Sequence, residues 1–184
     1  MALTRKSVAA FVRSNLRKAA LAVLALVAFS LLFGVPLKAV IIVVLLAVAA
    51  SFSTFYFNYV SAPVNFELVK LGTILASSVY GFLPGLAVGI ASTFFGKVLI
   101  GRIDEKLPIS MAAISAVALA ATVFSNVDIT QLGIALALAY NAAMFTLSIL
   151  MGGGLAWNLP YEVTGFIFNA LLFANVAPLL KQLM

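Results

Sequence analysis

The chain has 184 residues, of which 65% are hydrophobic and only 9% are charged. A soluble domain has about 45–50% apolar and about 25% charged residues, so this composition excludes an ordinary water-soluble fold. Apolar runs such as Ala39–Ala50 are unbroken, whereas a membrane β-barrel shows alternating polarity in segments of about ten residues. The sequence therefore predicts an all-α integral membrane protein, and its length fits a single domain.

The residue types that are absent exclude several chemistries. The chain has no cysteine and no histidine, which excludes disulfides, thiol catalysis, a Ser-His-Asp triad and the usual zinc sites. There is no Walker A sequence, so the chain itself is not expected to hydrolyse ATP. The sequence therefore favours a non-enzymatic role and indicates neither a cofactor nor a metal.

The net charge of +6 does not indicate a nucleic-acid partner, because five of the eleven basic residues fall in the first eighteen positions. Residues 1–18 are predicted to form a basic amphipathic segment that lies on the anionic cytoplasmic surface of the bilayer. Alternatively, these residues are the solvated first turns of the span that follows. Basic residues before an apolar run mark the cytoplasmic side, so the N-terminus is placed inside, in the plasma membrane. A cleaved secretory signal is the rival interpretation, but no small-residue cleavage site is clear after Leu21–Phe33.

Residues 19–184 are predicted to form one transmembrane domain, a bundle of six or seven segments. One of these stretches, Phe66–Gly101, would be about 50 Å long as a single helix, which is too long for a hydrocarbon core of about 30 Å. A short helical hairpin is therefore predicted at Gly81–Gly85, with Leu83 extended before Pro84. Its arms either cross a thin region or lie re-entrant among other helices. The other predicted spans are Ala19–Phe33, Lys38–Tyr59, Leu107–Phe124, Gln131–Met151 and Pro160–Leu180.

Counting spans from a cytoplasmic N-terminus assigns each loop to a side. The loops at 61–66, 101–107 and 152–159 fall inside, and those at 34–37 and 125–130 fall outside. Lys97, Arg102 and Lys106 then lie inside while Asp128 lies outside, as the positive-inside rule expects. Seven segments would place the C-terminus outside.

Small residues that recur at every fourth position allow helices to approach closely within a bilayer. Such stripes are predicted to form packing faces, within the chain or against a partner protein, whereas Val88 and Ile90 are expected to face lipid. The stripes are Gly81, Gly85 and Gly89; Ala112, Ala116 and Ala120; and Ala135, Ala139 and Ala143.

Ionisable residues near the membrane interior are functional candidates because burying them is costly. Glu67 and Glu162 lie near helix ends that enter the membrane, and Lys70 follows Glu67 on the same helical face. Glu67 and Lys70 could instead neutralise each other or reach lipid headgroups by snorkelling.

The run Trp157–Glu162 has a structural explanation and a functional one. Trp157 and Tyr161 are typical of an interfacial aromatic belt, with Pro160 starting a helix and Glu162 in its first turn. Because the run falls on the same membrane face as Glu67, it is also a candidate ligand site. Asn141 and Asn169 lie deeper and are as well suited to interhelical hydrogen bonds as to a ligand. The predicted ligand-binding residues are Glu67, Lys70, Asn141, Trp157, Asn158, Glu162 and Asn169.

Three segments, Phe66–Gly72, Tyr80–Gly89 and Leu159–Asn169, resemble the substrate-binding S-components of energy-coupling-factor vitamin transporters. That resemblance implies a small nutrient bound among the helices, a membrane partner subunit and two ATPase subunits. The chain departs from the family pattern in two ways. The family usually has six spans, whereas up to seven are counted here. The family also docks its partner through an Ala-xxx-Ala face on the first span, and the alanines of Ala19–Ala28 do not have that spacing. The family also admits substrate from outside, which conflicts with a charged cluster counted as inside.

The leading prediction is therefore a membrane transport protein that binds a small molecule within a helical bundle. The first alternative is a non-catalytic structural or accessory subunit of a larger membrane complex, favoured by the small-residue stripes. The second is a lipid-handling protein, which requires the Glu67 and Glu162 cluster to open sideways to lipid.

Overall fold

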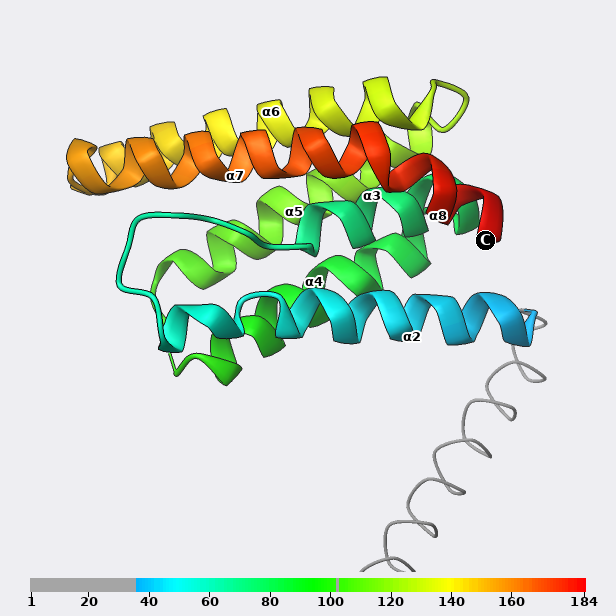
Figure 1. Cartoon of the computed structure of the whole chain (residues 1–184), viewed down its shortest axis with the longest axis horizontal. Helices are drawn as coiled ribbons and strands as arrows, with labels where there is room; N and C mark the ends of the chain where they lie inside the picture. The colour runs from blue at the N-terminus through cyan, green and yellow to red at the C-terminus, as the bar shows by residue number, and fades with distance from the viewer. Residues whose placement is uncertain (1–35, 102) are drawn as a thin grey trace, which may run out of the picture. The chain divides into compact units, whose positions relative to one another are not determined.

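The computed structural model describes residues 36–101 and 103–184, whose regular secondary structure is entirely helical (Figure 1). The chain falls into two units, Met1–Ile41 and Ile42–Met184, and the packing and the cavity discussed below lie within the second. The predicted segment 1–18 and span Ala19–Phe33 lie outside the described residues. The elements are α2 (Leu37–Phe52), the 3₁₀ helix η1 (Phe55–Asn58), α3 (Val69–Tyr80), α4 (Phe82–Leu99), α5 (Lys106–Val123), α6 (Ile129–Leu150), α7 (Leu155–Asn175) and α8 (Ala177–Leu183).

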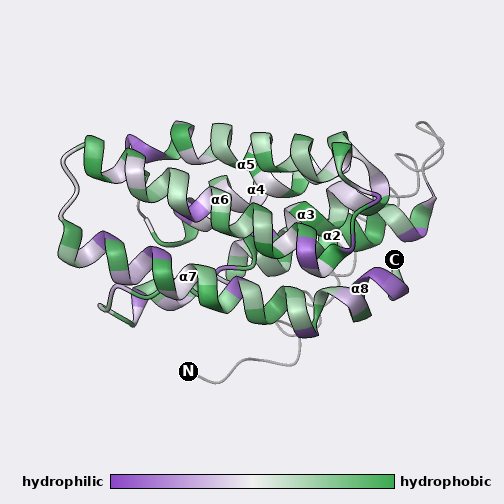
Figure 2. Ribbon diagram, turned by 90° about the horizontal axis from the view of Figure 1, so that it is seen from above, coloured by the Kyte–Doolittle hydropathy of each residue, from purple (hydrophilic) through white to green (hydrophobic). Residues whose placement is uncertain are grey.

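Several of these helices are long and apolar enough to cross a membrane. Four candidate spans are present in the described residues: Leu37–Asn58, α4, α5 and α6. Helices α7 and α8, which are bent by 49° at Val176, make a fifth if they are counted together. Figure 2 shows mainly hydrophobic residues along helices α2 to α7, with hydrophilic ones scattered among them, and hydrophilic residues near the C-terminus in α8. These lengths and compositions suit a multi-pass helical membrane protein.

The predicted hairpin is present, and its turn is made by Gly81, whose φ of 91° is a conformation that favours glycine. Helix α3 has 12 residues, about 18 Å at 1.5 Å per residue, and is too short to cross a hydrocarbon core. It is buried from Val69 to Ser77, so the first arm is a helix enclosed by others. The expectation of an extended Leu83 is wrong, because α4 begins at Phe82. Pro84 is tolerated there because the first-turn N–H groups of a helix have no intrahelical acceptor.

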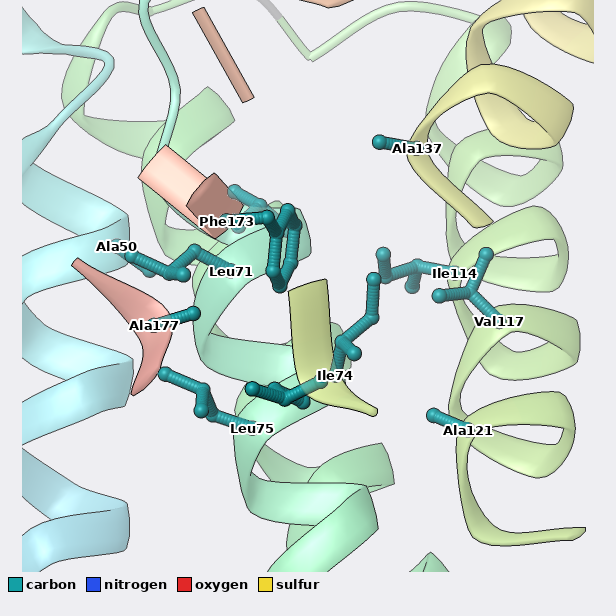
Figure 3. Packing of buried hydrophobic residues seen from close by; sticks show 12 residues of the cluster. Ala50, Leu71, Ile74, Leu75, Ile114, Val117, Ala121, Ala137, Phe173 and Ala177 are labelled. Atoms are coloured by element: carbon teal, nitrogen blue, oxygen red, sulfur yellow. The ribbon is translucent and has the colours of Figure 1, made fainter. Parts of the chain in front are cut away.

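The core is built around α3 (Figure 3). Leu71, Ile74 and Leu75 of α3 are at most 5% exposed. They belong to one apolar cluster with Ile114 of α5 and Phe173 of α7. Because α3 is enclosed by other helices, its position in the bundle is fixed. The segment 59–68, which leads into α3, must therefore end inside the bundle.

Close approach of backbones holds the two arms of the hairpin together. A Cβ atom built on Gly85 would lie 2.8 Å from the Cα of Ser77, and one on Gly89 would lie 2.9 Å from the Oγ1 of Thr73 and 3.0 Å from Ile114. Gly85 and Gly89 are therefore packed against α3 as the stripe predicts. Gly81 has no atom within 4 Å of such a Cβ, so it serves the turn and not the packing.

Three other expectations about helix faces are not met within the described chain. Ala112 and Ala116 are exposed and Ala120 is half-buried, so this stripe is not a packing face within the described chain. Val88, expected to face lipid, is fully buried and lies against Gly72. The stripe on α6 is likewise exposed, at Ala135, Ala139 and Ala143.

Three connections meet at one end of the bundle: the segment 59–68, the α4–α5 junction and the α6–α7 junction (Figure 1). The α5–α6 turn and the C-terminus lie at the other end. This grouping agrees with the predicted alternation of the loops. The segment 59–68 runs from that end back into the bundle to the start of α3.

Candidate functional site

A cavity of about 240 Å³ lies among these helices near the end where the three connections meet. Polar, charged and aromatic side chains line it. They come from η1 and the residue before it, from the segment before α3, from the α4–α5 junction and from helices α4 to α7. Pockets for drug-sized ligands usually measure about 300–1,000 Å³, so a cavity of about 240 Å³ has room only for a smaller molecule. The lining includes Phe57, Asn65, Glu67, Thr93, Lys97, Asp104, Lys106, Tyr140, Met144, Ser148, Trp157, Asn158, Tyr161 and Glu162.

The extended segment before α3 is held in place by hydrogen bonds from its own backbone. The backbone N–H of Asn65 donates to the Oγ1 of Thr164 over 3.0 Å, and that of Leu68 donates to the Oγ of Ser53 over 2.8 Å. The hydroxyl of Tyr56 accepts from the N–H of Phe66 and donates to the carbonyl of Val64. Non-helical backbone at membrane depth is stable only when it is satisfied in this way or lines a cavity. Here it does both.

Glu67 and Lys70 form an ion pair at the end of this segment. Lys70 is completely buried, and its Nζ lies 4.8 Å from the centre of the Tyr140 ring. The alternative in which Lys70 reaches lipid headgroups is therefore wrong, because its side chain is enclosed by the bundle and paired with Glu67. Glu67 lines the cavity, whereas Lys70 lies behind it and neutralises the Glu67 carboxylate.

Helix α7 contributes Trp157, Asn158, Tyr161 and Glu162 to the cavity. The predicted helix start at Pro160 is wrong, because α7 begins at Leu155 after the extended N-cap residue Gly154. Glu162 is therefore beyond the first turn, and its position is not explained by the helix dipole. Residues 158 and 162 are one turn apart on the same face of α7, which places both side chains against the cavity.

A chain of hydrogen bonds links α5, α6 and α7 at the cavity wall. The Nζ of Lys106 donates to the Oγ of Ser148 over 2.8 Å, and that hydroxyl donates to the Oδ1 of Asn158 over 2.8 Å. The Nδ2 of Asn158 donates in turn to the carbonyl of Gly154 over 2.9 Å. Sequence reasoning assigned Lys106 only to a charged loop and missed Ser148. The predicted topology places Lys106 on the same side of the membrane as Trp157–Glu162. That shared side is the signal that could have assigned Lys106 to the candidate site.

Lys97 and Asp104 close the α4–α5 junction beside the cavity. The Nζ of Lys97 lies 2.9 Å from both carboxylate oxygens of Asp104. The side chains are 24% and 44% exposed, so this pair is partly hydrated. Lys97 and Asp104 therefore neutralise each other.

Asn141 and Asn169, two predicted ligand residues, do not line the cavity. Asn169 is fully buried and its Nδ2 donates to the carbonyl of Gly165 over 2.9 Å. Asn141 is 3% exposed, and neither polar atom of its side chain has a partner within the described residues. The structure thus brings Glu67, Trp157, Asn158 and Glu162 together and leaves these two asparagines elsewhere in the core.

The cavity presents groups suited to binding. Buried at its wall, the Oδ1 of Asn65 and the Oγ1 of Thr93 have no hydrogen-bond partner in the part of the chain that the structure describes. Buried polar atoms are normally paired, so these atoms are available to a ligand or to water. Within residues 36–101 and 103–184, no group of three or more acidic side chains is arranged to hold a metal ion. Comparisons with protein-family models, with curated proteins and with solved structures find no match for this chain.

Proposed function

We propose that this chain is a membrane transport protein that binds a small polar molecule among its helices, in the manner of the S-components it resembles. The observation that carries the proposal is the cavity itself. It combines charged groups, aromatic rings and unpartnered polar atoms in the interior of an apolar bundle. Buried ionisable groups in such a setting are costly and are retained chiefly at binding sites and pathways.

The segment 59–68 supports the same proposal. Extended backbone that ends partway into a bundle, in front of a short buried helix, is an arrangement that transporters use at substrate sites. Here it brings Asn65 and Glu67 to the cavity.

The single tryptophan of the chain, Trp157, provides the test. The protein is purified in mild detergent, its small-molecule content is extracted and identified by mass spectrometry, and the extract is added back to stripped protein. Since Trp157 lines the cavity, binding should shift or quench its emission in a saturable way. An empty extract, together with unchanged Trp157 emission, would contradict the proposal.

A second candidate function, an accessory subunit of a larger membrane complex, is favoured by the exposed alanine stripe of α6 at Ala135, Ala139 and Ala143. Small residues on an exposed face permit close approach of another helix. The two candidates are compatible, because the proposed transport role includes a membrane partner and ATPase subunits. Isolation of a stable protein complex that carries no small molecule would favour the accessory role alone.

A further inference from the structure

Two charged side chains at the cavity make no ion pair within 4 Å among the described residues. The Glu67 carboxylate is paired with Lys70, and the Asp104 carboxylate with Lys97. Of the remaining charged residues in the lining, Lys106 has the hydroxyl of Ser148 as its side-chain partner, and Glu162 has neither an ion pair nor a hydrogen bond. Since an unpaired charge in a poorly hydrated site is costly, these two groups are suited to a ligand that supplies the opposite charges.

The two groups stand at different levels of the cavity. Lys106 is tied through Ser148 to Asn158 in the first turn of α7. Glu162 lies four residues further along the same helix, which is about 6 Å deeper at 1.5 Å per residue. A cationic group near the outer end and an anionic group one turn deeper therefore face the same space.

Hydrogen-bonding groups that have no partner are arranged in the same way, with donors near Lys106 and an acceptor near Glu162. The ammonium group of Lys106 has three donors, of which one is used by Ser148. On the Glu162 side, the Oδ1 of Asn65 is a buried acceptor without a donor, on a side chain that packs against Gly165 of α7. One part of the cavity therefore offers donors to an anion, and the other offers acceptors to a cation.

We infer that the cavity takes a zwitterion: a small molecule with a protonated amine toward Glu162 and the Oδ1 of Asn65, and with a carboxylate toward Lys106. This inference rests on the proposed function. The charges at the cavity sum to zero, because its three acidic residues are balanced by Lys70, Lys97 and Lys106. A ligand without net charge keeps this balance. Tyr161, which directly precedes Glu162, also lines the cavity, and aromatic faces attract cations.

The test compares three pools of probes built on the same skeletons. These are the genetically encoded amino acids with uncharged side chains other than tryptophan, their methyl esters, which are cations, and their N-acetyl derivatives, which are anions. Binding is followed by Trp157 emission and by the thermal unfolding temperature. The zwitterionic pool is expected to shift the emission and to raise the unfolding temperature by several degrees. Equal or tighter binding of either charged pool would overturn the inference.

If no pool binds, native mass spectrometry of the gently purified protein decides. A retained zwitterion supports the inference. A retained molecule of another charge class overturns it and leaves the proposed function standing. A protein that carries nothing contradicts the proposed function as well.

Charge-neutralising variants test the two ends separately. Glu162→Gln should weaken zwitterion binding at least tenfold and raise the affinity for the N-acetyl pool relative to the zwitterions. Lys106→Met should shift the preference toward the methyl esters. The control is Glu105→Gln, because Glu105 is exposed and lies outside the lining. A uniform loss of affinity for all pools in both variants, with unfolding temperatures retained, would overturn the assignment of the two ends.

Discussion

The ammonium group of Lys106 donates a hydrogen bond over 2.8 Å to the hydroxyl of Ser148, which joins the start of α5 to the end of α6 at the cavity wall. Ser148 is buried, and it is also the donor to Asn158 of α7. Three consecutive helices therefore meet through one hydroxyl group.

Ser148→Ala should destabilise the protein because it removes the acceptor of Lys106 and the donor to Asn158 together. Hydrogen bonds to charged groups contribute about 1.5–3 kcal/mol each, so a loss of this order is expected in the free energy of unfolding. The measurement is thermal or denaturant unfolding in detergent. Ser115→Ala is the matched control, since the hydroxyl of Ser115 bonds only to the carbonyl of Met111 in its own helix. Similar losses in the two variants would show that the link between helices is not stabilising.

The buried pair of Glu67 and Lys70 should show strong coupling in a double-mutant cycle. Glu67→Gln leaves the fully buried ammonium of Lys70 without its counterion, and breaking a buried pair in this way costs about 3–5 kcal/mol. Adding Lys70→Met should recover much of that loss, because no uncompensated charge then remains. Lys97 and Asp104 form the control pair, whose greater exposure predicts a coupling of about 0–1 kcal/mol. Additive effects of the two substitutions at Glu67 and Lys70 would contradict the ion pair.

Gly85→Ala should lower stability although alanine has the higher helix propensity. The added Cβ would lie 2.8 Å from the Cα of Ser77, so α3 and α4 must separate, and overpacking typically costs about 1–3 kcal/mol. Gly154→Ala is the control, because a Cβ there meets nothing within 4 Å and its φ of −68° suits alanine. Equal unfolding temperatures for the two variants would be inconsistent with close packing of the hairpin arms.

The two ends of the bundle should lie on opposite sides of the membrane. The chain has no native cysteine, so single cysteines can be introduced at Glu105, in the α4–α5 junction, and at Asp128, before α6. Both positions are exposed. In sealed cells, an impermeant thiol reagent should label only one of the two, and permeabilisation should expose the other. Labelling of both from the same side would rule out α5 as a single crossing.

Much of the helical arrangement could be predicted because apolar runs, glycines and prolines mark where helices begin and end. The hairpin at Gly81 and the grouping of the three connections follow from those signals. The buried face of each helix could not be predicted in the same way. Lipid-facing residues are as apolar as core residues, so the sequence does not distinguish fully buried Val88 from exposed Ala112 and Ala116.

The candidate site was predictable on α7 and less so elsewhere. Trp157, Asn158 and Glu162 are conspicuous because the chain has a single tryptophan and only 9% charged residues. Lys106 and Ser148 are not, because a lysine beside a loop and a serine within a helix usually have ordinary structural roles. Only the spatial meeting of α5, α6 and α7 gives these two residues their place at the cavity.

Native mass spectrometry of a matched pair of variants tests most directly whether a small molecule occupies this cavity. Met144 lines the cavity, and Thr146, two residues further along α6, is exposed and does not. Met144→Trp should fill part of the space and remove a bound mass that the wild-type protein and Thr146→Trp retain. Retention of the same mass by Met144→Trp, or its absence from the wild-type protein, would contradict binding in the cavity.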